Sequence, residues 1–248
     1  MSELTKSKPV TVRRIAVPRS YDVLADHLRE TILAGEIAEG ESLPTERELV
    51  VQTGLSRGSV REALRMLAVE GLVRTRPGRS GGNVVTLPGN DSMTNAIDRF
   101  VRGRKLPLRT IQETREFLEP ALARLAAQRR TEENIRKLKS LHDELITSAD
   151  NFQSFALINI KWHNAVAEAS GNELLAALLH SISHGVAIAT TTEEYDTTDT
   201  RKAVIRVHSK INEAIELQDA DLAERRMRQH IGATLTRAKT PSSLNIPL

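Results

Sequence analysis

The chain has 248 residues, 40% hydrophobic and 27% charged, so it is long enough to bury a core in one or two domains. It contains no cysteine, which excludes disulfide bonds and metal sites with thiolate ligands. The net charge of +3 permits binding to nucleic acid but does not require it, so the placement of the basic residues has to decide.

The patterning divides the chain near the sequence TLPGND, Thr86–Asp91. Helical patterns and a glycine-rich segment with alternating valines come before it, and almost continuous helical periodicity comes after it. We expect a disordered arm over 1–18, a first domain over 19–88, a second over 93–236 and a flexible tail over 237–248. The arm lacks the apolar core of a signal peptide, and no apolar run approaches a membrane span, so we expect a cytoplasmic protein without a membrane partner.

The first domain begins with helical signals. A helix is predicted over residues 20–34, with an apolar face and a glycine after its end. Thr45 and Glu48 have the spacing of a capping box, which predicts a second helix that ends at Gly54. Ser56 is placed to cap a third helix. Two helices joined by a short turn that contains glycine are typical of a helix-turn-helix.

The third predicted helix has an apolar face and a basic edge. Val60, Ala63, Leu64 and Leu67 follow the spacing of a buried helical face. Arg57, Arg61 and Arg65 repeat every four residues and therefore form a ridge beside that face. A ridge of this kind can follow a groove of DNA.

A hairpin is predicted after the third helix. The segments LVRTR and NVVTL alternate as strands around the basic sequence PGRSGG. Three helices followed by such a hairpin predict a winged helix-turn-helix. The alternative is a small helical domain whose arginines are merely solvated, but the cap, the turn, the ridge and the hairpin all agree with the winged domain.

The stretch LPTERELVVQTGLSRGSVREALRMLAVEGLV resembles the DNA-binding domain of GntR-family bacterial regulators, over about residues 20–87. In fatty-acid-responsive members, arginines at the positions of Arg47, Arg57 and Arg61 contact operator DNA. A glycine at the position of Gly78 enters the minor groove, beside a histidine whose position is Pro77 here. The resemblance therefore implies that this domain binds operator DNA.

Side-chain chemistry divides these contacts. Arginine can bind guanine O6 and N7 together, which is worth about 1–3 kcal/mol of base discrimination. The Ser56 cap and the helix N-terminus favour a phosphate, and we assign Arg47 mainly to the DNA backbone. The predicted DNA-binding residues are Arg47, Ser56, Arg57, Ser59, Arg61, Arg65 and Gly78.

The second domain is predicted to be an all-helical bundle with polar residues on its apolar stripes. Arg115 takes one position of the stripe that contains Ile111 and Leu122. A lone inward histidine is more often a core residue than a ligand, but three from different helices suggest a shared site. The inward polar residues are Arg115, Asn159, His163, His208 and His230. In contrast, we expect His180 and His184 at the surface, opposite a stripe of Leu174, Leu178 and Ile182.

This inward set resembles the metal site of the FCD class, the effector domain of the FadR subfamily of GntR regulators, over about residues 93–236. The class motif Asp-x-x-Phe-His supplies two ligands, and later helices supply two more histidines. Trp162 takes the aromatic position of the motif. Matched residue by residue, the metal ligands are Asn159, His163, His208 and His230.

The resemblance implies a divalent transition metal: zinc, or nickel or another late first-row metal, which imidazoles suit. Asn159 is a neutral ligand and weaker than the family's aspartate. Arg115 matches an arginine that contacts a bound carboxylate, so we expect a small carboxylate effector in contact with Arg115, Asn159 and Trp162. The resemblance also implies a homodimer that reads an inverted repeat of double-stranded DNA.

Together these features predict a non-enzymatic transcriptional regulator, a repressor rather than an activator, whose operator affinity is controlled by the effector. One alternative keeps the regulator but replaces the metal by a metal-free pocket for an acyl-coenzyme A or another organic acid. A rival from another class is a metal-dependent hydrolase. The sequence shows no acidic residue recognisably placed beside the histidines as a general base, which argues against the hydrolase.

Overall fold

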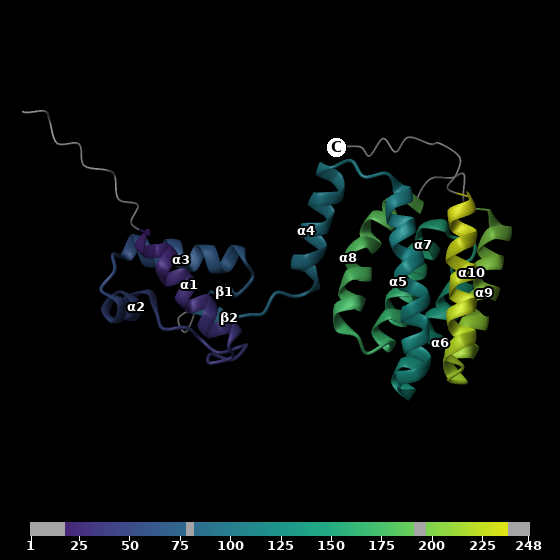
Figure 1. The fold of residues 1–248 in the computed structure, drawn as a ribbon, viewed down its shortest axis with the longest axis horizontal. Helices are drawn as coiled ribbons and strands as arrows, with labels where there is room; N and C mark the ends of the chain where they lie inside the picture. Colours follow the sequence, from purple (N-terminus) through teal and green to yellow (C-terminus); the bar gives the residue numbers. More distant parts are fainter. Residues whose placement is uncertain (1–17, 78–81, 191–196, 238–248) are drawn as a thin grey trace, which may run out of the picture. The chain divides into compact units, whose positions relative to one another are not determined.

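The computed structural model describes residues 18–77, 82–190 and 197–237. It contains two compact units, Met1–Pro88 and Gly89–Leu248. Three helices and a two-stranded sheet form the described part of the first unit, and helices alone form that of the second (Figure 1). The predicted fold class is therefore confirmed: a winged helix-turn-helix followed by an all-helical bundle.

Some predictions concern parts of the chain outside the described residues. They are the arm, apart from Pro18, the tail, apart from Arg237, and Gly78 at the tip of the hairpin. Within the described ranges, no helix combines the length and the apolar character that a membrane span needs.

The first unit packs its helices around one small core. Its elements are α1 (Ser20–Leu33), α2 (Glu46–Thr53), α3 (Arg57–Val69), β1 (Val73–Arg76) and β2 (Gly82–Val85). The strands pair antiparallel, with Val73 opposite Val85 and Arg76 opposite Gly82. The predicted apolar face of α3 is buried in this core, together with leucines of α1. Because one face of α3 is buried, its opposite edge remains exposed to solvent.

Local signals define the turn between α2 and α3. The backbone N–H of Thr45 donates to Glu48 Oε2 at 2.8 Å, and the Glu48 N–H donates back to Thr45 Oγ1 at 3.3 Å, as the predicted capping box requires. Gly54 ends α2 with φ of 70°, a left-handed conformation that glycine adopts without strain. The Ser59 N–H donates to Ser56 Oγ at 3.1 Å, so Ser56 caps α3.

An ion pair joins α1 to the end of α3. The guanidinium of Arg29 donates through two nitrogens to the two carboxylate oxygens of Glu70, each at 2.7 Å. These hydrogen bonds lower the pKa of Glu70. The pair is partly shielded, with side chains 24% and 35% exposed, so it is stronger than an ordinary surface pair.

We expect Glu70→Gln to lower the free energy of unfolding of the first unit by about 1 kcal/mol at pH 7. The Glu70 carboxylate has a lower pKa in the fold than in the unfolded chain, so its stabilisation is present above the unfolded pKa and is lost as the pH falls. Urea denaturation at pH 7 and pH 3 should therefore show that the difference in unfolding free energy between wild-type and Glu70→Gln protein is smaller at pH 3. Glu62→Gln, at an exposed pair with Arg65, is the control; a pH-independent difference would contradict the assignment.

The second unit is a bundle built around one central helix. Its helices are α4 (Asn90–Gly103), α5 (Leu108–Arg129), α6 (Glu132–Thr147), α7 (Phe152–Ala169), α8 (Glu173–Thr190), α9 (Thr198–Glu216) and α10 (Ala220–Arg237). Helix α5 packs against α7, α8, α9 and α10. Helix α6 covers α7 and α9, while α4 packs on α8 (Figure 1). This arrangement brings one face each of α7, α9 and α10 toward the interior around α5.

The predicted stripe on α8 is only partly correct, since Ile182 packs against Leu122 and Leu179 but Leu174 does not. Leu174 is 63% exposed, whereas Leu179 is 2% exposed and packs with Leu122 of α5. The buried face is therefore rotated from the predicted one, because α8 lies between α4, α5 and α7 and has to pack against all three. His180 is half-buried, and its Nδ1 lies 3.2 Å from Asn164 Nδ2. The side chain of His184 lies outside the described residues.

Candidate functional site

The exposed edge of α3 carries the predicted arginine ridge. Arg57, Arg61 and Arg65 are all exposed, and the side chains of the last two are 69% and 76% accessible. The four apolar residues of the opposite face, Val60, Ala63, Leu64 and Leu67, are at most 5% exposed. A helix that is anchored on one side and basic on the other has the geometry for insertion into a major groove.

Internal contacts hold several of these side chains in place. Arg61 Nε donates to Glu46 Oε2 of α2 at 2.8 Å, and Arg65 pairs with Glu62 at 3.3 Å. The hydroxyl of Ser59 lies 3.0 Å from Ser56 Oγ and 3.1 Å from Ser20 Oγ. Arg47 is exposed on α2. An approaching phosphate or base therefore has to compete with Glu46 for Arg61, while Arg47 is accessible from solvent.

Three imidazoles from three helices meet inside the bundle. His163 comes from α7, His208 from α9 and His230 from α10, and each is at most 8% exposed. His230 Nε2 lies 3.0 Å from His208 Nε2 and 3.4 Å from His163 Nε2. One ring nitrogen of each histidine lies within 4.8 Å of the others. We call these three residues the histidine cluster.

Two of the three nitrogen spacings within the histidine cluster match those of two ligands on one metal ion. Two nitrogens that bind one zinc at about 2.0–2.1 Å are about 2.9–3.4 Å apart when the angle at the metal is about 90–110°. The two shortest nitrogen distances fall within this range. The residues present therefore fit a late first-row metal.

A buried carboxylate sits behind His163. Glu119 of α5 is 1% exposed, and its Oε2 lies 2.5 Å from His163 Nδ1. Its other oxygen accepts a hydrogen bond from Arg115 Nε. Burial alone would raise the pKa of Glu119, but the charge of Arg115 and the hydrogen bonds from Arg115 and His163 outweigh it and lower the pKa to about 2. The Glu119 carboxylate is therefore ionised at neutral pH.

The Glu119 carboxylate determines the tautomer and the orientation of the His163 ring. Burial lowers the pKa of His163, and burial lowers that of His208 further, so both rings are neutral at pH 7. A neutral His163 donates its Nδ1 proton to Glu119 and leaves a lone pair on Nε2. That lone pair faces the histidine cluster. A metal ligand needs this tautomer, with the proton on Nδ1 and the lone pair on Nε2.

Two further polar atoms near the histidine cluster are buried without partners. Within the described residues, Asn159 Oδ1 and His208 Nδ1 make no hydrogen bond. Asn159 lies one helical turn before His163 on α7, so both side chains share a face. A buried carbonyl oxygen without a donor is costly, and a cation would satisfy it. This observation also fits a metal site.

Trp162 has a packing role beside the histidine cluster. Its ring stacks on His208 at a centroid distance of 3.6 Å, and its Nε1 donates to Asn212 Oδ1 at 3.0 Å. Arg115 is 6% exposed and bonded to Glu119. Direct contacts of Trp162 and Arg115 with an effector therefore stay predictions.

Sequence reasoning missed Glu119, an acidic residue that lies beside the histidine cluster. The signal was present: Glu119 follows Arg115 by four residues, the spacing of a pair on one helix face. Glu119 contacts the Nδ1 side of His163, behind the ring, and both of its oxygens are engaged. It is thus placed to orient His163 and not to take a proton from water.

Comparison with known families supports the arrangement in both units. Residues 20–81 match the model described as bacterial regulatory proteins, gntR family. Residues 110–233, half of the chain, match the FCD domain. The chain belongs to the GntR family, in the class with an FCD domain. The first match covers the arginine-lined α3, and the second covers all three histidines of this GntR-family protein.

Individual relatives of this GntR-family protein are regulators by name. It is 28% identical over 226 residues to the HTH-type transcriptional repressor NanR of Cronobacter sakazakii, covering 89% of this chain and 86% of that protein. It is 26% identical over 232 residues to NanR of Escherichia coli K12, covering 92% and 86%. The structure of Streptococcus agalactiae GntR has the same fold, with a TM-score of 0.63, 23% identity and coverage of 87% and 99%.

Proposed function

We propose that this GntR-family protein is a transcriptional repressor whose operator affinity is controlled by a small carboxylate bound at the histidine cluster. The observation that carries the proposal is the convergence of three buried imidazoles, beside the unpartnered Asn159 oxygen, in a chain whose α3 exposes a row of arginines. Both NanR relatives carry the name repressor. In this proposal the protein acts on DNA in the cytoplasm and is not an enzyme.

On the DNA side, the proposed contacts come from the exposed residues of α2 and α3. Arg57 and Arg61 would read bases or adjacent phosphates, while Arg47 and the N-terminus of α3 with Ser56 would bind the DNA backbone. Ser59, Arg65 and Gly78 complete the predicted surface. Arg61 would have to break its ion pair with Glu46 before it binds DNA, so its contact would form only when the duplex is close.

On the effector side, Asn159, His163, His208 and His230 would hold a divalent cation, zinc or nickel among them. Such a cation supplies positive charge in a site that is otherwise neutral. Arg115 is committed to Glu119, so an effector carboxylate would bind at the cation and reach Arg115 only if that pair opens. An effector controls DNA binding only if its affinity differs between two arrangements of the DNA-binding domains.

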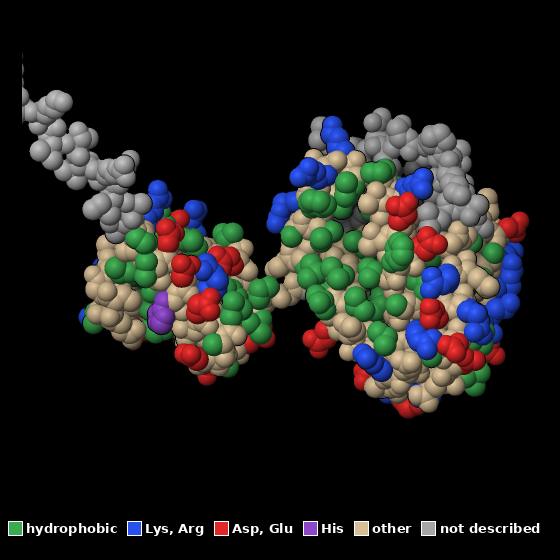
Figure 2. Space-filling view, viewed as in Figure 1, with side chains coloured by type: hydrophobic (Ala, Val, Ile, Leu, Met, Phe, Trp, Pro, Cys, Tyr) green, Lys and Arg blue, Asp and Glu red, His purple; other side chains and the backbone are tan. Residues whose placement is uncertain are grey.

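A homodimer would supply two recognition helices for an inverted repeat. Hydrophobic side chains gather on the face of the bundle that includes α5 and α8 (Figure 2). Phe117 of α5 is 83% exposed and Leu174 of α8 is 63% exposed. Large exposed apolar side chains mark interaction sites, which supports a second copy binding here.

We expect Phe117→Glu to convert the dimer into a monomer, because a charge in the middle of an apolar interface has no partner. Sedimentation velocity measures the change, and operator binding should weaken with it. Leu217→Glu is the matched control, since Leu217 is 69% exposed but lies in the turn between α9 and α10. A Phe117→Glu protein that sediments as a dimer would contradict this assignment of the interface.

The proposed function is tested with the purified protein and DNA from upstream of its own gene. Elemental analysis should find about one transition metal per chain, and a gel shift should show specific binding to that DNA. A panel of small carboxylates should then include one that weakens the complex. Absence of metal would overturn the metal site and leave the metal-free pocket, while turnover that depends on His163 would favour the hydrolase.

A further inference from the structure

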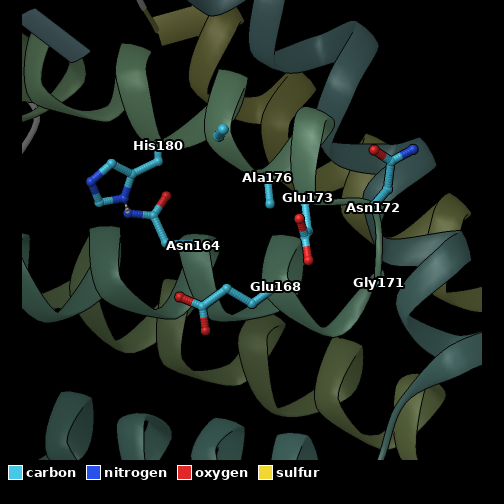
Figure 3. Close-up of a pocket in the computed structure, with 8 residues that line it drawn as sticks. Asn164, Glu168, Gly171, Asn172, Glu173, Ala176 and His180 are labelled. Atoms are coloured by element: carbon cyan, nitrogen blue, oxygen red, sulfur yellow. Dashed lines mark hydrogen bonds between the residues drawn. The ribbon is translucent and has the colours of Figure 1, made fainter. Parts of the chain in front are cut away.

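Two pockets in the described part of the helical bundle differ in the charge of their lining. One lies between α7 and α8, has a volume of about 350 Å³, and is lined by the carboxylates of Glu168 and Glu173 without any lysine or arginine. Figure 3 shows these carboxylates along the pocket, with the hydrogen bond between His180 and Asn164 at one end. None of the three clustered histidines lines this pocket. Glu168 pairs with Lys137, so the charge of this pocket comes mainly from Glu173, and its lining offers an anion no basic group.

The other pocket is a groove between α9 and α10, with a volume of about 210 Å³. Its lining includes Lys210 and Arg226 and contains no acidic residue. Val204 and Val207 form part of an apolar wall. We call it the α9–α10 groove. Its charge and its wall favour a ligand with an anionic group and an aliphatic part.

The α9–α10 groove reaches the histidine cluster through His230, which lines both. His230 is 8% exposed, against 4% for His163 and none for His208, so it is the most accessible of the three rings. Its Nε2 lies 3.0 Å from His208 Nε2. His230 is therefore the residue of the histidine cluster that a ligand in the groove would contact.

The two basic residues of the α9–α10 groove differ in how they are held. Arg226 pairs with Glu213 at 3.1 Å and donates to the backbone oxygen of Lys210. Lys210 makes no ion pair with any residue that the structure describes, and its side chain is exposed. Arg226 therefore shapes the end of the groove, and Lys210 offers a charge that an incoming anion can use.

We propose that the α9–α10 groove binds a short aliphatic carboxylate, with its carboxylate toward Lys210 and its chain along Val204 and Val207. The volume is smaller than the roughly 300–1,000 Å³ of pockets for drug-sized ligands, so the ligand is small. This carboxylate site is separate from the one proposed at the histidine cluster, and it rests on the proposed function only for the chemical class of the ligand. It does not depend on the metal, because none of the groove's own contacts requires one.

The test uses NMR of the full-length protein with labelled valine and alanine methyl groups, titrated with butyrate. We expect saturable shifts at Val204, Val207 and Ala233, and no shifts there with butylammonium, which has the same chain and the opposite charge. Lys210→Glu should weaken butyrate binding at least tenfold. Lys202→Glu is the matched control, because it makes the same change on α9 at an exposed residue that does not line the groove.

The titration is run on zinc-loaded and on metal-stripped protein, so that the two proposals fail separately. Butyrate shifts in stripped protein support the groove even if elemental analysis finds no metal. If zinc binds but butyrate causes no shifts in the groove, the proposed metal site stands and the proposed groove site is overturned. Equal affinity in wild-type and Lys210→Glu protein, or shifts at Ala176 and Ala177 of the α7–α8 pocket instead, would also overturn it.

Discussion

Replacing Arg57 and Arg61 together by alanine is expected to lower operator affinity by about 30-fold to 10⁴-fold. Each arginine contributes about 1–3 kcal/mol when it binds a base edge in two places, and every 1.4 kcal/mol is a factor of ten. Both side chains project from the exposed edge of α3, whose opposite face is anchored in the core. The fold should therefore survive the change, and circular dichroism should be unaltered.

The measurement is a fluorescence anisotropy titration with operator DNA at several salt concentrations. A matched control is Arg136→Ala with Arg225→Ala, which removes the same charge from exposed residues of the second unit. If one arginine contacts only phosphate, the slope of log affinity against log salt concentration should decrease in magnitude by about one. An unchanged affinity would show that α3 does not enter the groove.

Replacing Glu119 by leucine is expected to destabilise the metal-free protein by about 3–5 kcal/mol, because it leaves the buried Arg115 charge without a partner. Zinc affinity should also fall by about 10–100-fold, since His163 loses the acceptor that orients its ring. Urea denaturation measures the first effect, and competition with a chromophoric chelator measures the second.

A double variant separates these two roles of Glu119. Arg115→Leu with Glu119→Leu removes both buried charges, so most of the stability should return. Zinc affinity should stay low, because Nδ1 of His163 still lacks its acceptor. The control is Glu113→Leu, which breaks an exposed Arg–Glu pair of the same spacing on α5 and should cost less than about 1 kcal/mol. Full recovery of zinc affinity in the double variant would show that Glu119 acts only on stability.

The two units differ in how far sequence could predict them. In the first unit the decisive signals are local: the Thr45–Glu48 capping box, the turn at Gly54 and the Ser56 cap each lie within four residues of their partners. Such signals state where helices begin and end, and the arginine ridge follows from helical periodicity. The prediction for α8 was only partly correct because its buried face depends on packing against three other helices.

For the histidine site, the sequence by itself determined that His163, His208 and His230 lie on the inward faces of three helices. Only the tertiary structure decided that their ring nitrogens meet, that Glu119 stands behind His163, and that Lys210 and His230 line one groove. The physical reason is range: periodicity relates residues three or four apart, whereas the contacts among the histidines and Glu119 join residues 22–67 apart in the chain. How helices of a bundle are placed against one another depends on the packing of whole side-chain surfaces, which a local pattern does not contain.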